Sequence, residues 1–394
     1  MWVSRKLVPV IQHGLKTRPA VVLTGARQTG KTAFLRQAFP HCDFVSLDLP
    51  ALAEEAETSG ESLLARYKRP LIIDEVQYAP GLFRYLKHEI DLHRRQNGRF
   101  ILSGSQKLSL LQNVSETLAG RVAVLSLFTL SLEEIAPHWK KKPRRDQVLD
   151  FIWRGGYPEI HAQGIAPGRF YADYTATYIE RDLRQIVNVR DLRQFNRFMR
   201  ICASRIGQLV SASALANETG ITVNTAQAWL SALETSNIIL LLPPYFRNLG
   251  KRIVKAPKLY FSDTGLAAFL TGIQSLEQLL ALNMAGAYFE NLVVSEAFKR
   301  LSRSGAERNL YFYRDHHGKE VDLIYAQGNG LHLAECKLAE MPDPAAPGFK
   351  ELEKLAAENI LSKTIITPAH APIAAKGRGV AFNNVMDFSY WQGS

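Results

Sequence analysis

Cysteine is scarce in this chain: its 394 residues include only Cys42, Cys202 and Cys336, with no Cys-x-x-Cys pair. This number and spacing argue against a disulfide framework and against a zinc site. The sequence also lacks any apolar run near the roughly 20 residues that span a bilayer. Residues 1–16 lack the unbroken apolar core of a secretory signal. We therefore expect a reduced, cytoplasmic protein.

Acidic residues are in the minority, with 37 Asp and Glu against 48 Lys and Arg, and the formal net charge is +11. This excess favours an acidic partner, most often nucleic acid, with an anionic membrane surface as the alternative. We expect DNA rather than a membrane. The chain is too long for one compact core, and its length predicts two to four domains.

Residues 25–32 fit the phosphate-binding pattern G-x-x-x-x-G-K-[ST]. An apolar run at 20–24, typical of a buried strand, precedes the pattern, and a helix is expected over 32–38. Glycines let backbone N–H groups surround phosphates, and the helix N-terminus favours the same negative charge. Lys31 would reach the β- and γ-phosphates, and Thr32 would bind Mg²⁺. The residues expected to hold ATP are Gly25, Ala26, Arg27, Gln28, Thr29, Gly30, Lys31, Thr32 and Ala33.

The apolar segment 71–75 ends in two acids, Asp74 and Glu75. In a P-loop ATPase such a pair serves metal binding and water activation, so we assign Asp74 to Mg²⁺ and Glu75 to the catalytic base. The alternative is a pair that only caps the next helix. A further strand at 100–106 ends near Ser105 and Gln106, either of which could sense the γ-phosphate or simply form a turn.

Arg121 follows the sequence Leu-Ala-Gly and precedes a strand expected over 122–127. It is a candidate arginine finger, which supplies positive charge to the transition state from a neighbouring subunit. An ordinary surface arginine is the alternative. The first hypothesis predicts a homo-oligomer with the nucleotide at or near subunit interfaces.

The middle of the chain is expected to be helical. Residues 138–145 form a basic run that suits a linker, and a helix is expected around 178–183. Residues 209–233 predict a helix-turn-helix, with Ser213 and Thr222 as N-caps, Gly220 in the turn, and Val223 among the buried residues of the second helix. Segments 238–242 and 253–261 predict a β wing that carries a basic cluster: Arg247, Lys251, Arg252, Lys255 and Lys258. This module either contacts DNA or serves packing alone.

The last part of the chain carries acidic residues at positions that could form a metal site. Glu290 lies on a helix expected over 288–301, and strands are expected over 319–325 and 331–337. Alternation along the strands would place Asp322, Glu335 and Lys337 on one face. Glu290, Asp322 and Glu335 are candidate Mg²⁺ ligands, and Lys337 could position a water for phosphodiester attack. A solvated hairpin with cross-strand ion pairs is the alternative.

Taken together, these motifs resemble those of bacterial AAA+-type ATPases that carry a C-terminal domain of unknown function with a PD-(D/E)xK nuclease-like fold. The resemblance implies ATP and Mg²⁺ binding at the first site, a helical and winged-helix middle, and a nuclease-like end. Ala26 stands where this group commonly has proline. The matching segments are 25–32, 46–48, 74–77 with Pro80, 102–105, 118–121, 156–159, 258–260, 263–266, 289–291, and 320–322 with Glu335 and Lys337.

We thus expect an α/β protein with four parts: a P-loop, AAA+-like parallel-sheet ATPase domain (1–136), a helical lid or linker (137–205), a winged-helix domain (206–268) and an α+β PD-(D/E)xK nuclease-like domain (269–394). The expected function is an Mg²⁺-dependent ATPase that remodels or repairs branched or duplex DNA. One alternative is an ATP-dependent DNA nuclease. Another is a nucleotide-gated switch that recruits partner proteins without acting on nucleic acid.

Overall fold

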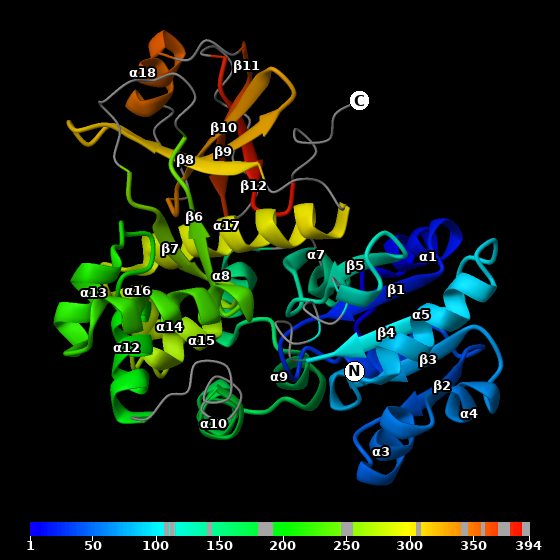
Figure 1. The fold of residues 1–394 in the computed structure, drawn as a ribbon. Helices are drawn as coiled ribbons and strands as arrows, with labels where there is room; N and C mark the ends of the chain where they lie inside the picture. Colours follow the sequence, from blue (N-terminus) through cyan, green and yellow to red (C-terminus); the bar gives the residue numbers. More distant parts are fainter. Residues whose placement is uncertain are drawn as a thin grey trace.

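A computed structural model describes the chain except residues 106–109, 111–113, 115, 140–143, 180–191, 246–254, 305–308, 340–345, 356–358, 369–378 and 388–394. It contains an N-terminal sheet, a helical region and a C-terminal sheet (Figure 1). The long helix α17 (Ala285–Ser304) lies between the C-terminal sheet and the helical region. No helix in the described part of the chain is both long enough and apolar enough to cross a membrane.

The N-terminal sheet is parallel, with the strand order β2-β3-β4-β1-β5. Its strands are β1 (Ala20–Thr24), β2 (Asp43–Ser46), β3 (Leu71–Asp74), β4 (Phe100–Gly104) and β5 (Val122–Ser126). Every residue of the interior strand β1 is buried. Its alternate residues enter two separate apolar clusters: Val22 lies in one, and Val21 and Leu23 lie in the other. Both faces are therefore covered, as in other doubly wound sheets. The carboxyl ends of the strands meet at one edge, where ligands bind in this fold class.

Helical segments in the described part of the chain accompany this sheet. They are α1 (Val8–Thr17), α2 (Lys31–Ala38), α3 (Pro50–Thr58), α4 (Gly60–Ala65), the 3-10 turn η1 (Val76–Tyr78) and α5 (Leu82–Leu92). The chain breaks its helical course at Ser59, because α3 ends at Thr58 and α4 begins at Gly60. The helix predicted after the P-loop is confirmed as α2.

The middle region is mainly helical. Its elements are α7 (Leu132–Ile135), η2 (Ala136–His138), α8 (Arg145–Arg154), α9 (Pro158–Gln163), α10 (Pro167–Tyr174), the π-helical turn η3 (Thr175–Ile179), α12 (Leu192–Ser204), α13 (Ala212–Thr219), α14 (Val223–Thr235), the hairpin strands β6 (Ile239–Leu242) and β7 (Lys258–Phe261), α15 (Thr264–Leu270) and α16 (Leu276–Ala281). Most of the helix expected at 178–183 and half of the basic run at 138–145 lie outside the described residues.

The two helices predicted at 209–233 form as α13 and α14, but two details were wrong. Ser211, rather than Ser213, caps α13 by accepting a hydrogen bond from the backbone N–H of Ala214. Val223 is 42% exposed instead of buried. Thr222 caps α14 as predicted, and Gly220 adopts φ +82°, the left-handed conformation that suits glycine in this turn.

The C-terminal sheet has the order β12-β11-β10-β9-β8. Strands β8 (Leu310–Arg314), β9 (Glu320–Gln327) and β10 (Gly330–Cys336) are antiparallel, whereas β11 (Asn359–Thr367) and β12 (Ala381–Asn384) continue the sheet in parallel. Helix α18 (Pro347–Leu355) lies between β10 and β11 in the chain. One apolar cluster extends from Leu130 through the helical region to this sheet. The three segments expected as separate domains after residue 136 therefore share a core.

Candidate nucleotide site and acidic cluster

The P-loop has the backbone geometry that its glycines predict. Gly25 adopts φ +155°, and a Cβ at this position would lie 2.3 Å from the carbonyl oxygen of Leu127. Gly30 adopts φ +85° at the N-cap of α2. A side chain at Gly25 would displace the backbone, and one at Gly30 would be strained. The turn leads directly into the N-terminus of α2. A glycine-bounded turn at a helix N-terminus can present successive backbone N–H groups to phosphate.

Lys31 and Thr32 begin α2 beside the end of β3. The ammonium of Lys31 donates to the carbonyl oxygens of Gly25 (2.9 Å) and Ala26 (3.1 Å) within the turn. The hydroxyl of Thr32 donates to Asp74 Oδ2 at 2.6 Å. Ser103, on the neighbouring strand β4, donates to the other oxygen of Asp74. The structure thus brings together the three residues that the sequence assigned to phosphate and metal.

Glu75 directly follows β3 and adopts φ +52°, which is uncommon for a residue with a side chain. Its Oε2 accepts hydrogen bonds from the backbone N–H (3.3 Å) and the hydroxyl (3.1 Å) of Ser105, and from the side-chain amide of Gln77. Ser105 therefore contacts the predicted base. Gln106, the other residue considered for this role, lies outside the described residues.

Three residues near the site were missed as site residues by sequence reasoning. Gln77 was recognised only as part of a resemblance, yet it holds Glu75. Asp48 follows β2, and its removal from water, with the nearby carboxylates of Glu75 and Asp74, raises its pKa. Arg5 precedes α1 and donates to the carbonyl oxygens of Thr29 (3.0 Å) and Phe128. No sequence pattern marks Arg5, because its partners lie far away in the chain.

A cavity of about 370 Å³ opens beside the P-loop. Trp2 and Val3 of the N-terminal segment and Pro158 and Glu159 of α9 contribute to its lining. The cavity is polar at only a few points, which is typical of small-molecule sites. Its lining comprises Met1, Trp2, Val3, Arg5, Gln28, Thr29, Gly30, Ala33, Phe34, Leu130, Pro158, Glu159, Ala162 and Gln163.

Arg121 lies away from the P-loop of its own chain. It immediately precedes β5, and its carbonyl oxygen accepts from Ala20 N–H at the amino end of β1, the edge opposite the P-loop. Its guanidinium pairs with Asp91 on α5 at 2.9 Å. Any role as an arginine finger would have to be played in a neighbouring subunit, and this stays a prediction.

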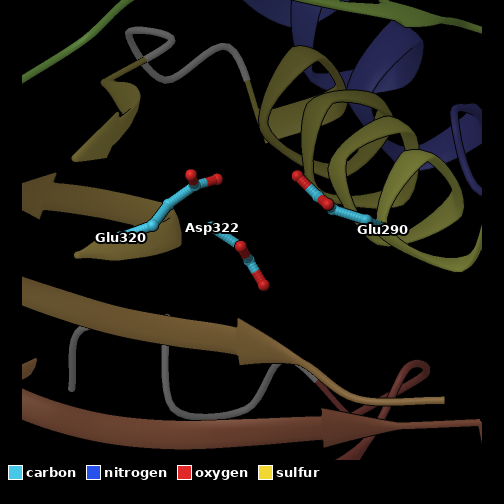
Figure 2. A group of neighbouring side chains, drawn as sticks. All are labelled: Glu290, Glu320 and Asp322. Atoms are coloured by element: carbon cyan, nitrogen blue, oxygen red, sulfur yellow. The ribbon is translucent and has the colours of Figure 1, made fainter. Parts of the chain in front are cut away.

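A group of three carboxylates forms where α17 meets β9. Figure 2 shows Glu290 extending from α17 toward Glu320 and Asp322, and ligand atoms of the three lie within 4.8 Å of one another. Glu290 and Asp322 were predicted, whereas Glu320 was not assigned to the site. Glu335 is not part of this group and bonds Lys337 Nζ at 2.8 Å. Removal from water, followed by the charges of Glu290 and Glu335, raises the pKa of Asp322.

Lys258 lies within this acidic group rather than on the surface of a basic wing. It is only 1% exposed, and its Nζ contacts Glu290 Oε1 at 2.8 Å and Glu320 Oε1. Burial alone would lower its pKa, but the carboxylates of Glu290, Asp322 and Glu320 outweigh burial and hold the pKa above its usual value. The wing prediction was therefore wrong for Lys258. Lys255 is exposed, and Arg247, Lys251 and Arg252 lie outside the described residues.

Comparisons with known proteins agree with the first part of this description. Residues 17–136 match the model of the AAA domain family. Residues 145–277 and 285–386 match two families described only as domains of unknown function, DUF8612 and DUF4143.

Among solved structures, a Walker-type ATPase of Pyrococcus abyssi is 14% identical, with 68% of this chain and 96% of that chain covered and a TM-score of 0.47. The RuvB Holliday junction branch migration motor of Thermotoga maritima is 15% identical, with 60% and 89% covered and a TM-score of 0.31. These scores are too low to support an argument about this chain.

Two curated relatives, uncharacterized proteins of Mycobacterium tuberculosis and Mycobacterium bovis, are each 32% identical over 342 residues. The matched region spans 84% of this chain and 73% of each relative. The chain therefore belongs to the same family as these mycobacterial proteins, and its first domain is an AAA-type P-loop ATPase domain.

Proposed function

We propose that this protein is an Mg²⁺-dependent ATPase whose P-loop site hydrolyses ATP to do work on DNA. The observation that carries the proposal of Mg²⁺-dependent ATP hydrolysis is the 2.6 Å hydrogen bond from Thr32 to Asp74. It joins the helix that follows the P-loop to the acid that ends β3. A hydroxyl and a carboxylate are the oxygen ligands that Mg²⁺ prefers, so both side chains fit this ion. When bound, Mg²⁺ would neutralise charge on the β- and γ-phosphates.

The remaining roles follow from position. Lys31 leaves its carbonyl partners to bind the β- and γ-phosphates, where its charge stabilises the transition state. Glu75 accepts a proton from the attacking water, and its hydrogen bonds from Ser105 and Gln77 fix its orientation. The cavity beside Gln28–Gly30 takes the base and ribose, with Trp2 and Pro158 as apolar walls.

The first experiment is ATP binding and hydrolysis by Lys31→Ala. We expect both to fall at least about tenfold, because the variant loses a charge-assisted contact to phosphate. Lys87→Ala is the matched control, since this lysine is exposed on α5. Unaltered ATP binding and turnover in Lys31→Ala would remove the basis for this site.

Action on DNA is supported by the net charge of +11 and by the α13–α14 pair. Asn224 and Gln227 are exposed on α14, where their amides suit base edges or phosphates. We expect linear, single-stranded or branched DNA to stimulate ATP hydrolysis, and binding to weaken steeply with salt. ATP hydrolysis that no nucleic acid alters, combined with tight binding of a protein partner, would instead favour a nucleotide-gated switch.

We extend the proposal to the C-terminal domain and to assembly. The order of one helix, three antiparallel strands, a helix and a parallel strand supports a nuclease-like fold for residues 285–386. A homo-oligomer is supported by Arg121, whose side chain retains 28% exposure at the sheet edge despite its pairing with Asp91. Arg121→Ala tests this part: turnover per site should fall while ATP binding by the isolated subunit is preserved.

A further inference from the structure

We propose that the ammonium of Lys258 takes the place of a metal ion in the C-terminal acidic cluster. The cluster then forms ion pairs that hold the β6–β7 hairpin against the C-terminal sheet. It does not bind the Mg²⁺ that a nuclease would need. The inference is independent of ATP hydrolysis at the P-loop.

Geometry is the first argument. Lys258 Nζ touches one oxygen of Glu290 and one oxygen of Glu320, two of the three carboxylates that could have shared a metal ion. The same Glu290 oxygen also accepts from the hydroxyl of Tyr260 at 2.5 Å. The third carboxylate, Asp322, accepts from the backbone N–H of Cys336 at 2.8 Å. At least one oxygen of each of the three carboxylates is therefore already engaged by a protein donor.

Charge is the second argument. Four carboxylates are gathered in this region, on Glu290, Glu320, Asp322 and Glu335. Among the described residues, three side-chain cations face them: Lys258, Lys337, and Arg314, which pairs with Glu320 at 3.3 Å. A divalent ion added to this set would overcompensate the charge and would repel the buried ammonium at close range. Buried charges persist when they are paired and hydrogen-bonded, and Lys258 meets both conditions.

Position in the fold is the third argument. Lys258 is the first residue of β7, whereas Glu290 is on α17 and Glu320 begins β9. The same hairpin is bonded to the sheet a second time, by Tyr245 N–H to Phe312 O at 2.8 Å and Phe312 N–H to Pro243 O at 3.1 Å. The ion pairs thus reinforce an existing contact between the β6–β7 hairpin and the C-terminal sheet, as expected of a structural role.

Glu335 indicates how a metal ion would have to bind if the proposal were wrong. Its Oε2 is buried without a hydrogen-bond partner among the described residues, so it is open to a ligand. A catalytic metal would therefore depend on Asp322 and Glu335 together. The decisive question is whether the intact protein binds a divalent ion through these two side chains.

The first measurement is Mn²⁺ binding by the full, nucleotide-free chain, followed by titration calorimetry or electron paramagnetic resonance. We expect wild type, Asp322→Asn and Glu335→Gln to bind the same amount of Mn²⁺ with the same affinity. A site present in wild type and lost in both variants would overturn the proposal. This comparison uses variants that keep Lys258, so it does not depend on the stability of a lysine variant.

The second measurement removes the ammonium. Lys258→Met keeps most of the side-chain volume but leaves the carboxylates without their shared cation, so we expect a melting temperature at least about 3 °C lower. We also expect the variant to gain one Mn²⁺ site, which Lys258→Met/Asp322→Asn loses again. Lys255→Met, at an exposed lysine, is the control and should match wild type. A Lys258→Met protein that melts like the control, or gains no Mn²⁺ site, would contradict the proposal.

Discussion

The buried ion pair between Arg5 and Glu134 gives a sharp test of how the N-terminal segment supports the P-loop. The two side chains are 5% and 4% exposed, and Arg5 Nε lies 3.3 Å from Glu134 Oε1. Arg5 also donates to Thr29 O within the P-loop. We consider Arg5→Met, which keeps an apolar stem of similar length but removes the guanidinium.

Removing one partner of a buried pair costs about 3–5 kcal/mol, because the other charge stays buried without compensation. Glu134 would keep backbone N–H donors from Lys6 (2.9 Å) and Ser131 (3.0 Å), and Arg303 at 3.8 Å. We therefore expect the free energy of unfolding of Arg5→Met to fall by about 3 kcal/mol, the lower limit of this range. In addition, Thr29 O loses its donor, so ATP binding should weaken.

Urea unfolding of the N-terminal domain measures the first effect, and nucleotide titration measures the second. The double variant Arg5→Met/Glu134→Gln is the matched comparison, since Gln keeps the capping interaction with Ser131 but carries no charge. It should be more stable than Arg5→Met alone. If the free energy of unfolding of Arg5→Met falls by less than about 1 kcal/mol, the reasoning is refuted. It is also refuted if the double variant is less stable than Arg5→Met.

The same pair predicts a pH dependence. Removal from water alone would raise the pKa of Glu134, but Arg5, Arg303 and the backbone hydrogen bonds outweigh it and hold the pKa below its usual value. A carboxyl group of this kind stabilises the fold above its unfolded pKa, and this contribution is lost as pH falls through the lower folded pKa. The difference in free energy of unfolding between wild type and Arg5→Met should therefore become smaller below about pH 4. A constant difference would contradict the assignment.

Two further predictions concern local structure. Ser211→Ala should lower stability by about 1 kcal/mol in urea unfolding, because it removes the α13 cap, whereas Ser213→Ala should change it by less than about 0.5 kcal/mol; equal effects would contradict the cap. Gly25→Ala should abolish ATP binding in a nucleotide titration, since the added methyl would collide with Leu127 O at 2.3 Å; near-normal affinity would show that the P-loop tolerates the shift.

Local patterns predicted which residues of the candidate nucleotide site lie together at the edge of the N-terminal sheet, for a physical reason. The P-loop and the Asp74–Glu75 pair each combine an apolar strand with polar residues at its carboxyl end, and parallel pairing brings those ends together. The sequence reasoning needed no long-range contact to place Lys31, Thr32 and Asp74 at one edge of the sheet.

Long-range pairing explains what the sequence did not indicate. Lys258 looked like part of a surface cluster of lysines and arginines, but its ammonium is buried against side chains 32 and 62 positions further along the chain, counted from the residue numbers of Glu290 and Glu320. No local pattern distinguishes a buried lysine from an exposed one. The cap of α13 was misplaced for a different reason: Ser211 and Ser213 are both competent caps, and only the backbone conformation selects between them.

The most direct test of the central claim is ATP turnover by Glu75→Gln. The variant keeps the shape of the side chain but cannot accept a proton, so the account predicts a turnover rate at least about 100-fold lower and ATP binding close to that of wild type. Glu54→Gln, at an exposed glutamate of α3, should hydrolyse ATP at the normal rate. Wild-type turnover in Glu75→Gln would contradict the claim that water is activated by the acid at the end of β3.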